Sequence, residues 1–473
     1  MYRMMLVLWV LALPGCSRVA PPETQRDPNI VFEGALERRV LPAGEQVKEH
    51  ARVRIGVRDP GSSEDAPVNV AMVIDTSGSM KGEPIVEARK AALALLDALA
   101  DDDRLAVITF HSKTDVLLES TPLDDDAREQ ARKGIESMRA LGTTDMAGGV
   151  QAAIDQVNAH FDPRGINRVV LLGDGVPNQE GALRAMAQSA GQRGITITSL
   201  GLGEDYDETL MGAMAQLSGG RFHYVESAEK VVAFFKNEAL RLDGVYARNA
   251  VLELTPGPGV EIEDVIGHVV QRDSVVSVGL GDMSRDEARD VFVKLNVRAH
   301  RAGAPVELLD AVLRYDDPLD SSIRKERRLY FGANASAITA DIDRGRDRVV
   351  EAGLARAVAA AETLKAIELV RQGDGAGAST RLSLAMAEAR NKSKEHDAPE
   401  LKKQVKAMEK LQRALESGQK VSDAAVREAT PGLPPPGASV QPSPAPQAGQ
   451  YEYSSPAKRA IRSAHDESMQ VVQ

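Results

Sequence analysis

The sequence predicts an α/β domain with a doubly wound, mostly parallel sheet, accompanied by a β-sandwich and a C-terminal helical bundle. Over residues 68–242, short apolar segments alternate with amphipathic helical periods. Residues 29–60 and 245–335 show the alternation typical of strands, whereas residues 343–428 show only helical periods. Alternating strands and helices favour a parallel sheet that helices cover on both faces.

The first sixteen residues have the features of an export signal. Arg3 precedes an apolar stretch of about ten residues, which is too short to span a bilayer. Leu13-Pro14-Gly15-Cys16 resembles a bacterial lipobox, in which the chain is cut before the cysteine and that cysteine is lipidated. An ordinary signal peptide with a chance cysteine is the alternative, but Cys16 is the only cysteine in the chain.

We therefore expect a signal peptide with lipobox over residues 1–16 and a tether over residues 17–28. The lipid on Cys16 would hold the protein on a membrane of the cell envelope, facing the periplasm or the surface, with the outer membrane as one option. A single cysteine also excludes an intramolecular disulfide and a cysteine zinc site.

Composition limits the other partners. The formal charge of -11 argues against binding to a phosphate backbone. An aromatic content of 4% argues against a surface on which single-stranded nucleic acid could stack. We expect no nucleic acid partner.

The α/β domain is expected to contain a regular series of elements. Its strands are predicted over residues 68–75, 105–110, 169–173, 195–200 and 222–225, with an antiparallel edge strand over 114–119. Its helices are predicted over residues 84–99, 125–139, 148–159, 180–192, 207–217 and 228–242.

The flanking regions are expected to form two further parts and a tail. Residues 29–60 are too few to bury a core alone, so we expect them to pair with strands over 245–335 in one β-sandwich, into which the α/β domain is inserted. Its later strands are predicted over residues 250–254, 274–278, 291–297 and 311–315. The bundle over 343–428 reads as three antiparallel helices, either a plain bundle or a relative of tetratricopeptide hairpins. The proline-rich tail over 431–473 is expected to be disordered, with residues 458–462 as a docking peptide or an ordinary part of the tail.

Oxygen-bearing side chains follow three segments of the α/β domain. Residues 71–80 read AMVIDTSGSM, so a buried strand ends in Asp75-x-Ser77-x-Ser79. Ser79 could instead cap the following helix, although a cap needs one such residue rather than three. Thr144 lies in a loop before a predicted helix, and Asp174 follows another strand. All three segments would meet at the carboxyl edge of the sheet, where ligands bind in open α/β sheets.

With these residues, the region from 68 to 242 resembles a von Willebrand factor type A (VWA) domain. The metal ion-dependent adhesion site (MIDAS) of that family uses Asp-x-Ser-x-Ser, a distant Thr and a distant Asp. The resemblance implies a site made of Asp75, Ser77, Ser79, Thr144 and Asp174. Thr143 competes with Thr144 for the threonine position. Gly142-Thr143-Thr144 departs from the family where a second glycine is common, and Gly173 departs where a threonine is common.

The resemblance also implies the ion and its use. Mg²⁺, or Mn²⁺ or Ca²⁺ in its place, would bind directly to the serine and threonine hydroxyls, while the two aspartates act through water or orient the hydroxyls. Because the direct ligands are neutral, the ion could accept an Asp or Glu carboxylate from a partner protein. We therefore expect a lipid-anchored protein-binding module. The alternatives are an assembly or regulatory factor that works with an AAA ATPase, and a structural envelope protein.

We do not expect an enzyme. The eight histidines show no metal-ligand or nucleophile pattern, and no Ser-His pairing is evident around His111. The acidic runs at 101–103 and 124–126 could hold calcium or form solvated turns, and neither has the spacing of an EF-hand loop.

Overall fold

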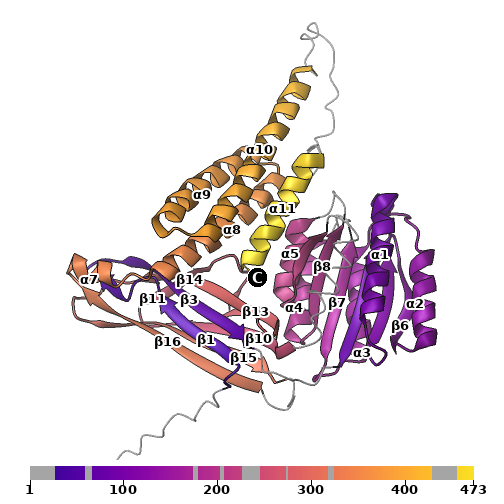
Figure 1. The fold of residues 1–473 in the computed structure, drawn as a ribbon, viewed down its shortest axis with the longest axis horizontal. Coiled ribbons are helices and arrows are strands. Elements are labelled where there is room, and N and C mark those ends of the chain that lie inside the picture. The colour runs from indigo at the N-terminus through magenta and orange to yellow at the C-terminus, as the bar shows by residue number, and fades with distance from the viewer. Residues whose placement is uncertain are drawn as a thin grey trace, which may run out of the picture.

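The computed structural model consists of three parts that Figure 1 shows side by side: an α/β domain, a domain of two β-sheets and a helical region. Cys16, Asp174 and the expected helix over 228–242 lie outside the described residues. The structure describes residues 27–58, 67–173, 179–202, 207–225, 245–272, 275–317, 324–428 and 455–472.

The sheet of the α/β domain has the strand order β6-β5-β4-β7-β8-β9. Every residue of β4 is buried, and β4 pairs in parallel with β5 on one side and β7 on the other. Within this sheet only β6 runs antiparallel to its neighbour, as expected for the edge strand. The strands are β4 (Val68–Asp75), β5 (Arg104–Phe110), β6 (Thr114–Pro122), β7 (Ile166–Gly173), β8 (Thr196–Leu202) and β9 (Phe222–Val225).

Helices pack on both faces of this sheet because β4 presents apolar side chains on both. Met72 and Ile74 share a core with α1 (Glu83–Ala98) and α2 (Asp125–Ser137). Ala71 and Val73 point the other way, into a core with α3 (Met146–Ala159), α4 (Glu180–Gln192) and α5 (Glu208–Ser218). A run of apolar residues without polar alternation is the pattern of a strand buried on both faces.

The second part contains two sheets whose apolar residues form one shared core. The first sheet has the order β1-β3-β14-β11 and the second the order β12-β13-β10-β15-β16-β2. Their strands are β1 (Ile30–Leu36), β2 (Val40–Pro42), β3 (Val47–Val57), β10 (Val245–Pro256), β11 (Val260–Val265), β12 (Gln271–Arg272), β13 (Val276–Ser284), β14 (Ala288–Val297), β15 (Pro305–Asp316) and β16 (Arg324–Ser336).

The expected pairing of the early segment with the later strands is present, because β3 pairs with β14 along ten residue pairs from Val47↔Val297 to Gly56↔Ala288. The strand β16, which pairs with β15, was not predicted from the sequence. Residues 324–328 are all charged and hid the strand signal, but Phe331, Ala333 and Ala335 of the same strand alternate into the shared core.

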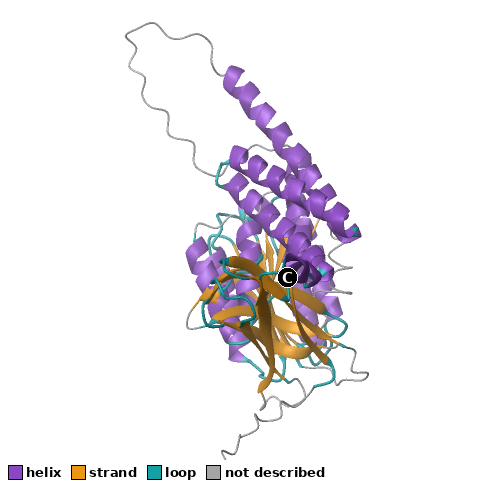
Figure 2. Ribbon diagram, turned by 90° about the vertical axis from the view of Figure 1, so that its left-hand side faces the viewer, coloured by secondary structure: helices purple, strands orange, loops and turns teal. Residues whose placement is uncertain are grey.

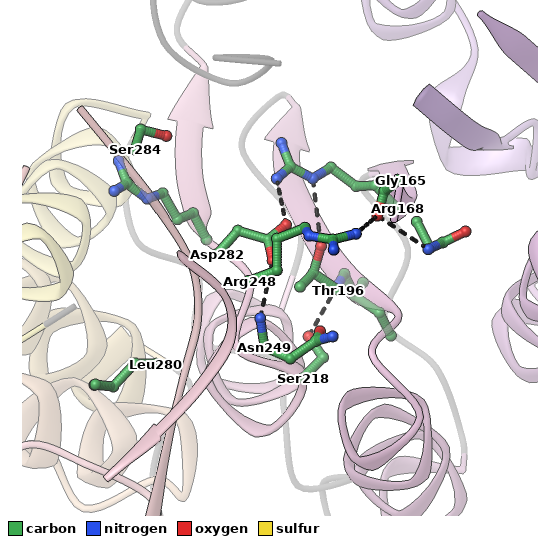
Figure 3. A network of polar contacts seen from close by, with 12 residues as sticks. Gly165, Arg168, Thr196, Ser218, Arg248, Asn249, Leu280, Asp282 and Ser284 are labelled. Carbon is green, nitrogen blue, oxygen red and sulfur yellow. Dashed lines mark hydrogen bonds and ion pairs between the residues drawn. The ribbon is translucent and has the colours of Figure 1, made fainter. Parts of the chain in front are cut away.

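A buried polar joint connects the α/β domain to the two-sheet domain (Figure 3). Arg248 of β10 is 2% exposed and donates from Nη1 to the carbonyl oxygen of Gly165 at 3.1 Å. Arg168 of β7 donates to Thr196 Oγ1 at 3.3 Å and pairs with Asp282 of β13 at 3.4 Å. Gly165, Arg168 and Thr196 lie at the amino ends of β7 and β8, so the joint holds the edge of the sheet opposite to the predicted metal site.

The helical region contains α7 (Thr339–Arg344), α8 (Arg348–Arg371), α9 (Gly375–His396) and α10 (Pro399–Glu428). Three long helices over residues 343–428 are as expected, and α8 ends just before Gly373, which has a φ of 93°. In Figure 2 the long helices of this region extend away from the strands. At the end of α8, the Arg371 guanidinium pairs with Asp207 at 2.9 Å and Glu208 at 3.0 Å, where β8 leads into α5.

The expectation of disorder over 431–473 is wrong for its last part. Residues 455–472 form α11 (Ser455–Val472), which lies between the other helices and the α/β domain in Figure 1 and packs against α8, α10, α5 and β9. Its polar composition concealed an apolar stripe with helical spacing. The possible docking peptide at 458–462 therefore lies within a packed helix. The buried apolar residues of α11 are Ala457, Ala460, Ile461, Ala464, Met469 and Val472.

Among the described helices, none is long and apolar enough to cross a bilayer.

His465 makes the contact between α11 and the sheet sensitive to pH. Its ring is 3% exposed and stands edge-on to Phe222 with centroids 4.9 Å apart. Burial, with the nearby Arg371 and Arg462 charges, lowers the pKa of His465 to about 3. The unfolded chain therefore binds this proton more readily than the folded chain below the ordinary histidine pKa, and stability falls as the pH drops.

We predict that His465→Leu reduces the acid sensitivity of folding. Between pH 6.5 and pH 5, one such histidine costs the folded chain roughly 2 kcal/mol, and the variant should lose about that much less than the wild type. Urea denaturation at several pH values measures the difference. His160→Asn, at an exposed histidine of α3's C-cap, is the control. Equal pH dependence in wild type and His465→Leu would contradict the assignment.

Candidate metal centre

The predicted site begins where β4 leaves the sheet. The Asp75 side chain is buried and Ser77 is 1% exposed, whereas Ser79 is exposed. Asp75 Oδ1 accepts a hydrogen bond from the Ser77 backbone N–H at 2.7 Å, which fixes the turn directly after the strand. The Oγ atoms of Ser77 and Ser79 lie 2.9 Å apart.

The helix-cap alternative for Ser79 is wrong. The N-cap of α1 is Gly82, which makes no side-chain cap. Ser77 precedes the short 3-10 helix η1 (Gly78–Met80) and likewise makes no side-chain cap hydrogen bond. The two serine hydroxyls instead face each other.

The loop that carries Thr144 is joined to this turn by two backbone hydrogen bonds. Leu141 N–H donates to the Thr76 carbonyl at 2.8 Å, and Gly78 N–H donates to the Gly142 carbonyl at 3.1 Å. Asp145 then caps α3 by accepting from Gly148 N–H at 3.1 Å, which places Thr144 directly before the helix. Thr144 is half-buried, whereas Thr143 is exposed.

Residues that were not predicted to belong to the site hold the Thr144 loop in place. Thr76 Oγ1 donates to the Phe110 carbonyl at 3.0 Å, and Asp145 N–H donates to the His111 carbonyl at 2.6 Å. Gly142 has a φ of 68°, and a Cβ there would lie 2.8 Å from Ser112 Oγ. A positive φ in a crowded loop requires glycine. Gly142 was therefore a sequence signal for the tight turn before Thr143 and Thr144.

The third segment reaches the same place. β7 ends at Gly173, and a Cβ on Gly173 would lie 3.0 Å from Asp75 Cβ. Glycine thus permits the close approach of β7 to Asp75 at a position where the family commonly has threonine. Asp174 is the next residue and lies outside the described residues. β7 therefore ends at the edge that holds Asp75, Ser77 and Ser79, and Asp174 follows it in the sequence.

The residues present suit a hard divalent ion. In an octahedral Mg²⁺ site with metal–oxygen distances of about 2.1 Å, neighbouring ligands are about 3 Å apart. The separation of 2.9 Å between the two serine hydroxyls matches that spacing. Ser77, Ser79 and Thr144 would hold the ion, and the buried Asp75 would orient Ser77 as an outer partner.

His111 lies beside the site, and the structure corrects the view that it has no serine partner. Ser112 Oγ lies 2.9 Å from His111 Nδ1, and Asp115 Oδ2 lies 3.6 Å from His111 Nε2. Ser112 N–H also donates to the same Nδ1 at 2.7 Å, so the lone pair that could activate the hydroxyl already accepts a backbone hydrogen bond. The arrangement fastens the loop next to Gly142.

The first acidic run lies in a turn, and the second forms the N-cap and the first two residues of α2. In the first, Asp103 Oδ2 accepts from Ala100 N–H at 2.7 Å. In the second, Asp124 Oδ1 accepts from Ala127 N–H at 2.8 Å and caps α2.

Comparison with known proteins agrees with this description. Residues 68–224 match the family model of the von Willebrand factor type A domain. The chain is 28% identical over 281 residues to protein sll0103 of Synechocystis, covering 56% of this chain and 66% of that protein. It is 28% identical over 233 residues to human inter-alpha-trypsin inhibitor heavy chain H3, covering 44% of this chain and 26% of that protein. The chain thus spans less than two thirds of the length of these relatives.

Solved structures share the fold beyond the family match. The von Willebrand factor type A protein from Catenulispora acidiphila has a TM-score of 0.64 at 20% identity, over 81% of this chain and 90% of that one. The ArnB paralog VWA2 from Sulfolobus acidocaldarius has a TM-score of 0.56 at 15% identity, over 81% of this chain and 94% of that one. The chain therefore contains a VWA-type α/β domain. Such domains generally serve in protein interaction or adhesion, and they often bind a divalent metal ion.

We predict that Gly142→Ala weakens Mg²⁺ binding several-fold. A methyl group there would press on Ser112 and displace the loop that carries Thr144. Gly44→Ala is a matched control, because Gly44 also has a positive φ, of 85°, but its Cβ would meet nothing within 4 Å. Calorimetric titration with Mg²⁺ should separate the two variants. If both bind Mg²⁺ like the wild type, the loop does not support the site as described.

Proposed function

We propose that this protein binds a partner protein through a divalent metal ion held by Asp75, Ser77, Ser79, Thr144 and Asp174. The observation that carries the proposal is the pair of serine hydroxyls 2.9 Å apart at the carboxyl edge of the sheet. The buried Asp75 holds the turn that carries them by accepting from the Ser77 backbone N–H, and backbone hydrogen bonds bring the Thr144 loop alongside. Ser79 is exposed, so a partner could reach an ion at this position.

The ligand types define the chemistry of the partner. Hydroxyl groups do not neutralise the ion, so a bound Mg²⁺ would keep a strong attraction for an anionic oxygen. A carboxylate from an Asp or Glu of the partner would complete the coordination. We propose recognition rather than catalysis, because Nδ1 of His111, a histidine beside the site, already accepts a hydrogen bond from the Ser112 backbone N–H.

We propose further that the protein works in the cell envelope, held to a membrane through a lipid on Cys16. The support is the sequence of residues 1–16, an apolar stretch that ends in the only cysteine of the chain. The tether over 17–28 would separate the lipid from β1. Lipid anchoring at Cys16 would place the metal site where it meets envelope proteins.

We predict that Thr144→Ala lowers Mg²⁺ affinity at least tenfold and that Asp75→Ala abolishes binding, because each removes part of the site. Thr143→Ala, at the exposed neighbouring threonine, should bind like the wild type. Calorimetry is the measurement of choice, because the only tryptophan, Trp9, lies in the predicted signal peptide. Crosslinking and pull-down from an envelope extract should then recover a partner with Mg²⁺ and not with EDTA or with Thr144→Ala. Metal binding unchanged by Asp75→Ala would reject the site, and capture that survives EDTA would reject the metal bridge.

We predict that the wild type sediments with membranes and that Cys16→Ser releases it into a soluble fraction. A lipid chain is the only anchor the proposal provides, so its loss should be sufficient. Cell fractionation with immunoblotting measures the change. Wild-type protein found in the soluble cytoplasmic fraction would favour the alternative of an assembly factor that works with an AAA ATPase.

A further inference from the structure

A second group of metal-binding side chains lies far from the VWA site, at the open end of the α8–α9 hairpin. Glu351 belongs to the first turn of α8, and Glu395 and His396 are the last two residues of α9. One ligand atom from each side chain lies within 4.8 Å of the other two. In the described part of the chain, this is the one group of three or more such side chains whose ligand atoms lie this close together.

The distances suit ligands that share an ion better than groups that bond to each other. His396 Nε2 lies 3.8 Å from Glu351 Oε2 and 3.9 Å from Glu395 Oε2. A charged hydrogen bond between such groups would be about 2.8 Å long. Ligands that share a tetrahedral zinc ion at about 2.0–2.1 Å lie roughly 3.3–3.4 Å apart, so each observed gap would shorten by about 0.5 Å on binding.

The histidine provides the independent sign of a ligand. The His396 side chain is 3% exposed, and neither of its ring nitrogens has a hydrogen-bond partner. A buried polar group without a partner costs about 1–3 kcal/mol, so an imidazole is not expected to be left in this way without a purpose. Its Nε2 is the atom that faces both carboxylates, and the Glu351 side chain beside it is 5% exposed.

The two basic side chains beside these carboxylates do not prevent a cation from binding. Arg346 Nε pairs with Glu351 through Oε1 at 3.2 Å, so Oε2 remains directed at His396. Lys392 Nζ bonds to Glu395 Oε2 at 3.0 Å, but their side chains are 33% and 52% exposed. A pair so exposed contributes little, and an ion could replace the lysine at small cost. The position at the C-terminal end of α9 also favours positive charge.

A cavity borders this group of side chains at Glu351. It has a volume of about 300 Å³ and lies between the two-sheet domain and helices α8 and α9. Glu351 and Lys392 line it together with Glu37, His50 and Glu388. Next to it, Arg346 forms a β-bridge with Arg38, which connects the start of α8 to the two-sheet domain.

We propose that Glu351, Glu395 and His396 bind a transition-metal dication of the Zn²⁺ class, separately from the Mg²⁺ site of the VWA domain. The imidazole ligand distinguishes this site from the all-oxygen VWA site and favours zinc or a similar ion over magnesium. Bound there, the ion ties the start of α8 to the end of α9, opposite the turn at Gly373. It thereby fastens the helical region where it joins the two-sheet domain.

The test is titration of the full chain with Zn²⁺ in the presence of excess Mg²⁺, followed by calorimetry and by thermal unfolding. We expect one Zn²⁺ site and a rise in Tm. Glu395→Gln, at an exposed position that should fold normally, and His396→Asn should weaken Zn²⁺ binding at least tenfold and remove the rise. His160→Asn, at an exposed histidine, and Asp75→Ala, in the VWA site, should keep both.

Two outcomes would overturn the proposal. If His396→Asn and Glu395→Gln bind Zn²⁺ with wild-type affinity and stoichiometry, the cluster is a set of ion pairs and not a metal site. If Asp75→Ala removes the Zn²⁺ site, the zinc occupies the VWA site instead. Co²⁺ in place of Zn²⁺ gives an independent readout, since its visible absorption should appear in the wild type and disappear in His396→Asn.

Discussion

The structure depends on the burial of β4 at the centre of the α/β sheet. All eight residues of this strand are buried, and its six apolar side chains contribute to cores on both faces of the sheet. A strand with parallel neighbours on both sides must end at the carboxyl edge of the sheet. Asp75 therefore cannot move without disturbing two cores, and the turn that follows it is anchored on a rigid base. This is the kind of support that a binding site with fixed ligand positions requires.

The two edges of the sheet have different roles. The amino edge is fixed to the two-sheet domain by the buried joint of Arg248, Arg168 and Asp282. The carboxyl edge carries the proposed metal site, and the end of α8 is attached to that same edge through Arg371. A partner that binds the metal would thus meet an edge with the helical region close by, whereas the opposite edge stays attached to the two-sheet domain.

Much of the α/β domain could be predicted from the sequence, because apolar strands and amphipathic helices leave local patterns. The meeting of the β4 turn with the Thr144 loop could be predicted too, since one follows a strand and the other precedes a helix. The features that were not predicted depend on contacts between segments that are far apart in the sequence. The backbone bond from Gly78 to Gly142 and the approach of Glu351 to His396 have no local signature. The helix α11 and the strand β16 were missed because charged outer faces masked their buried stripes.

The central claim is that one divalent ion binds between the β4 turn and the Thr144 loop. A crystal of the full chain grown with Mn²⁺ and examined by anomalous scattering tests it most directly. We expect a peak within about 2.2 Å of Ser77 Oγ, Ser79 Oγ and Thr144 Oγ1, with Asp75 and Asp174 placed around it. Absence of a peak at this position in crystals that hold Mn²⁺ elsewhere, with the Ser77–Ser79 hydrogen bond intact, would contradict it.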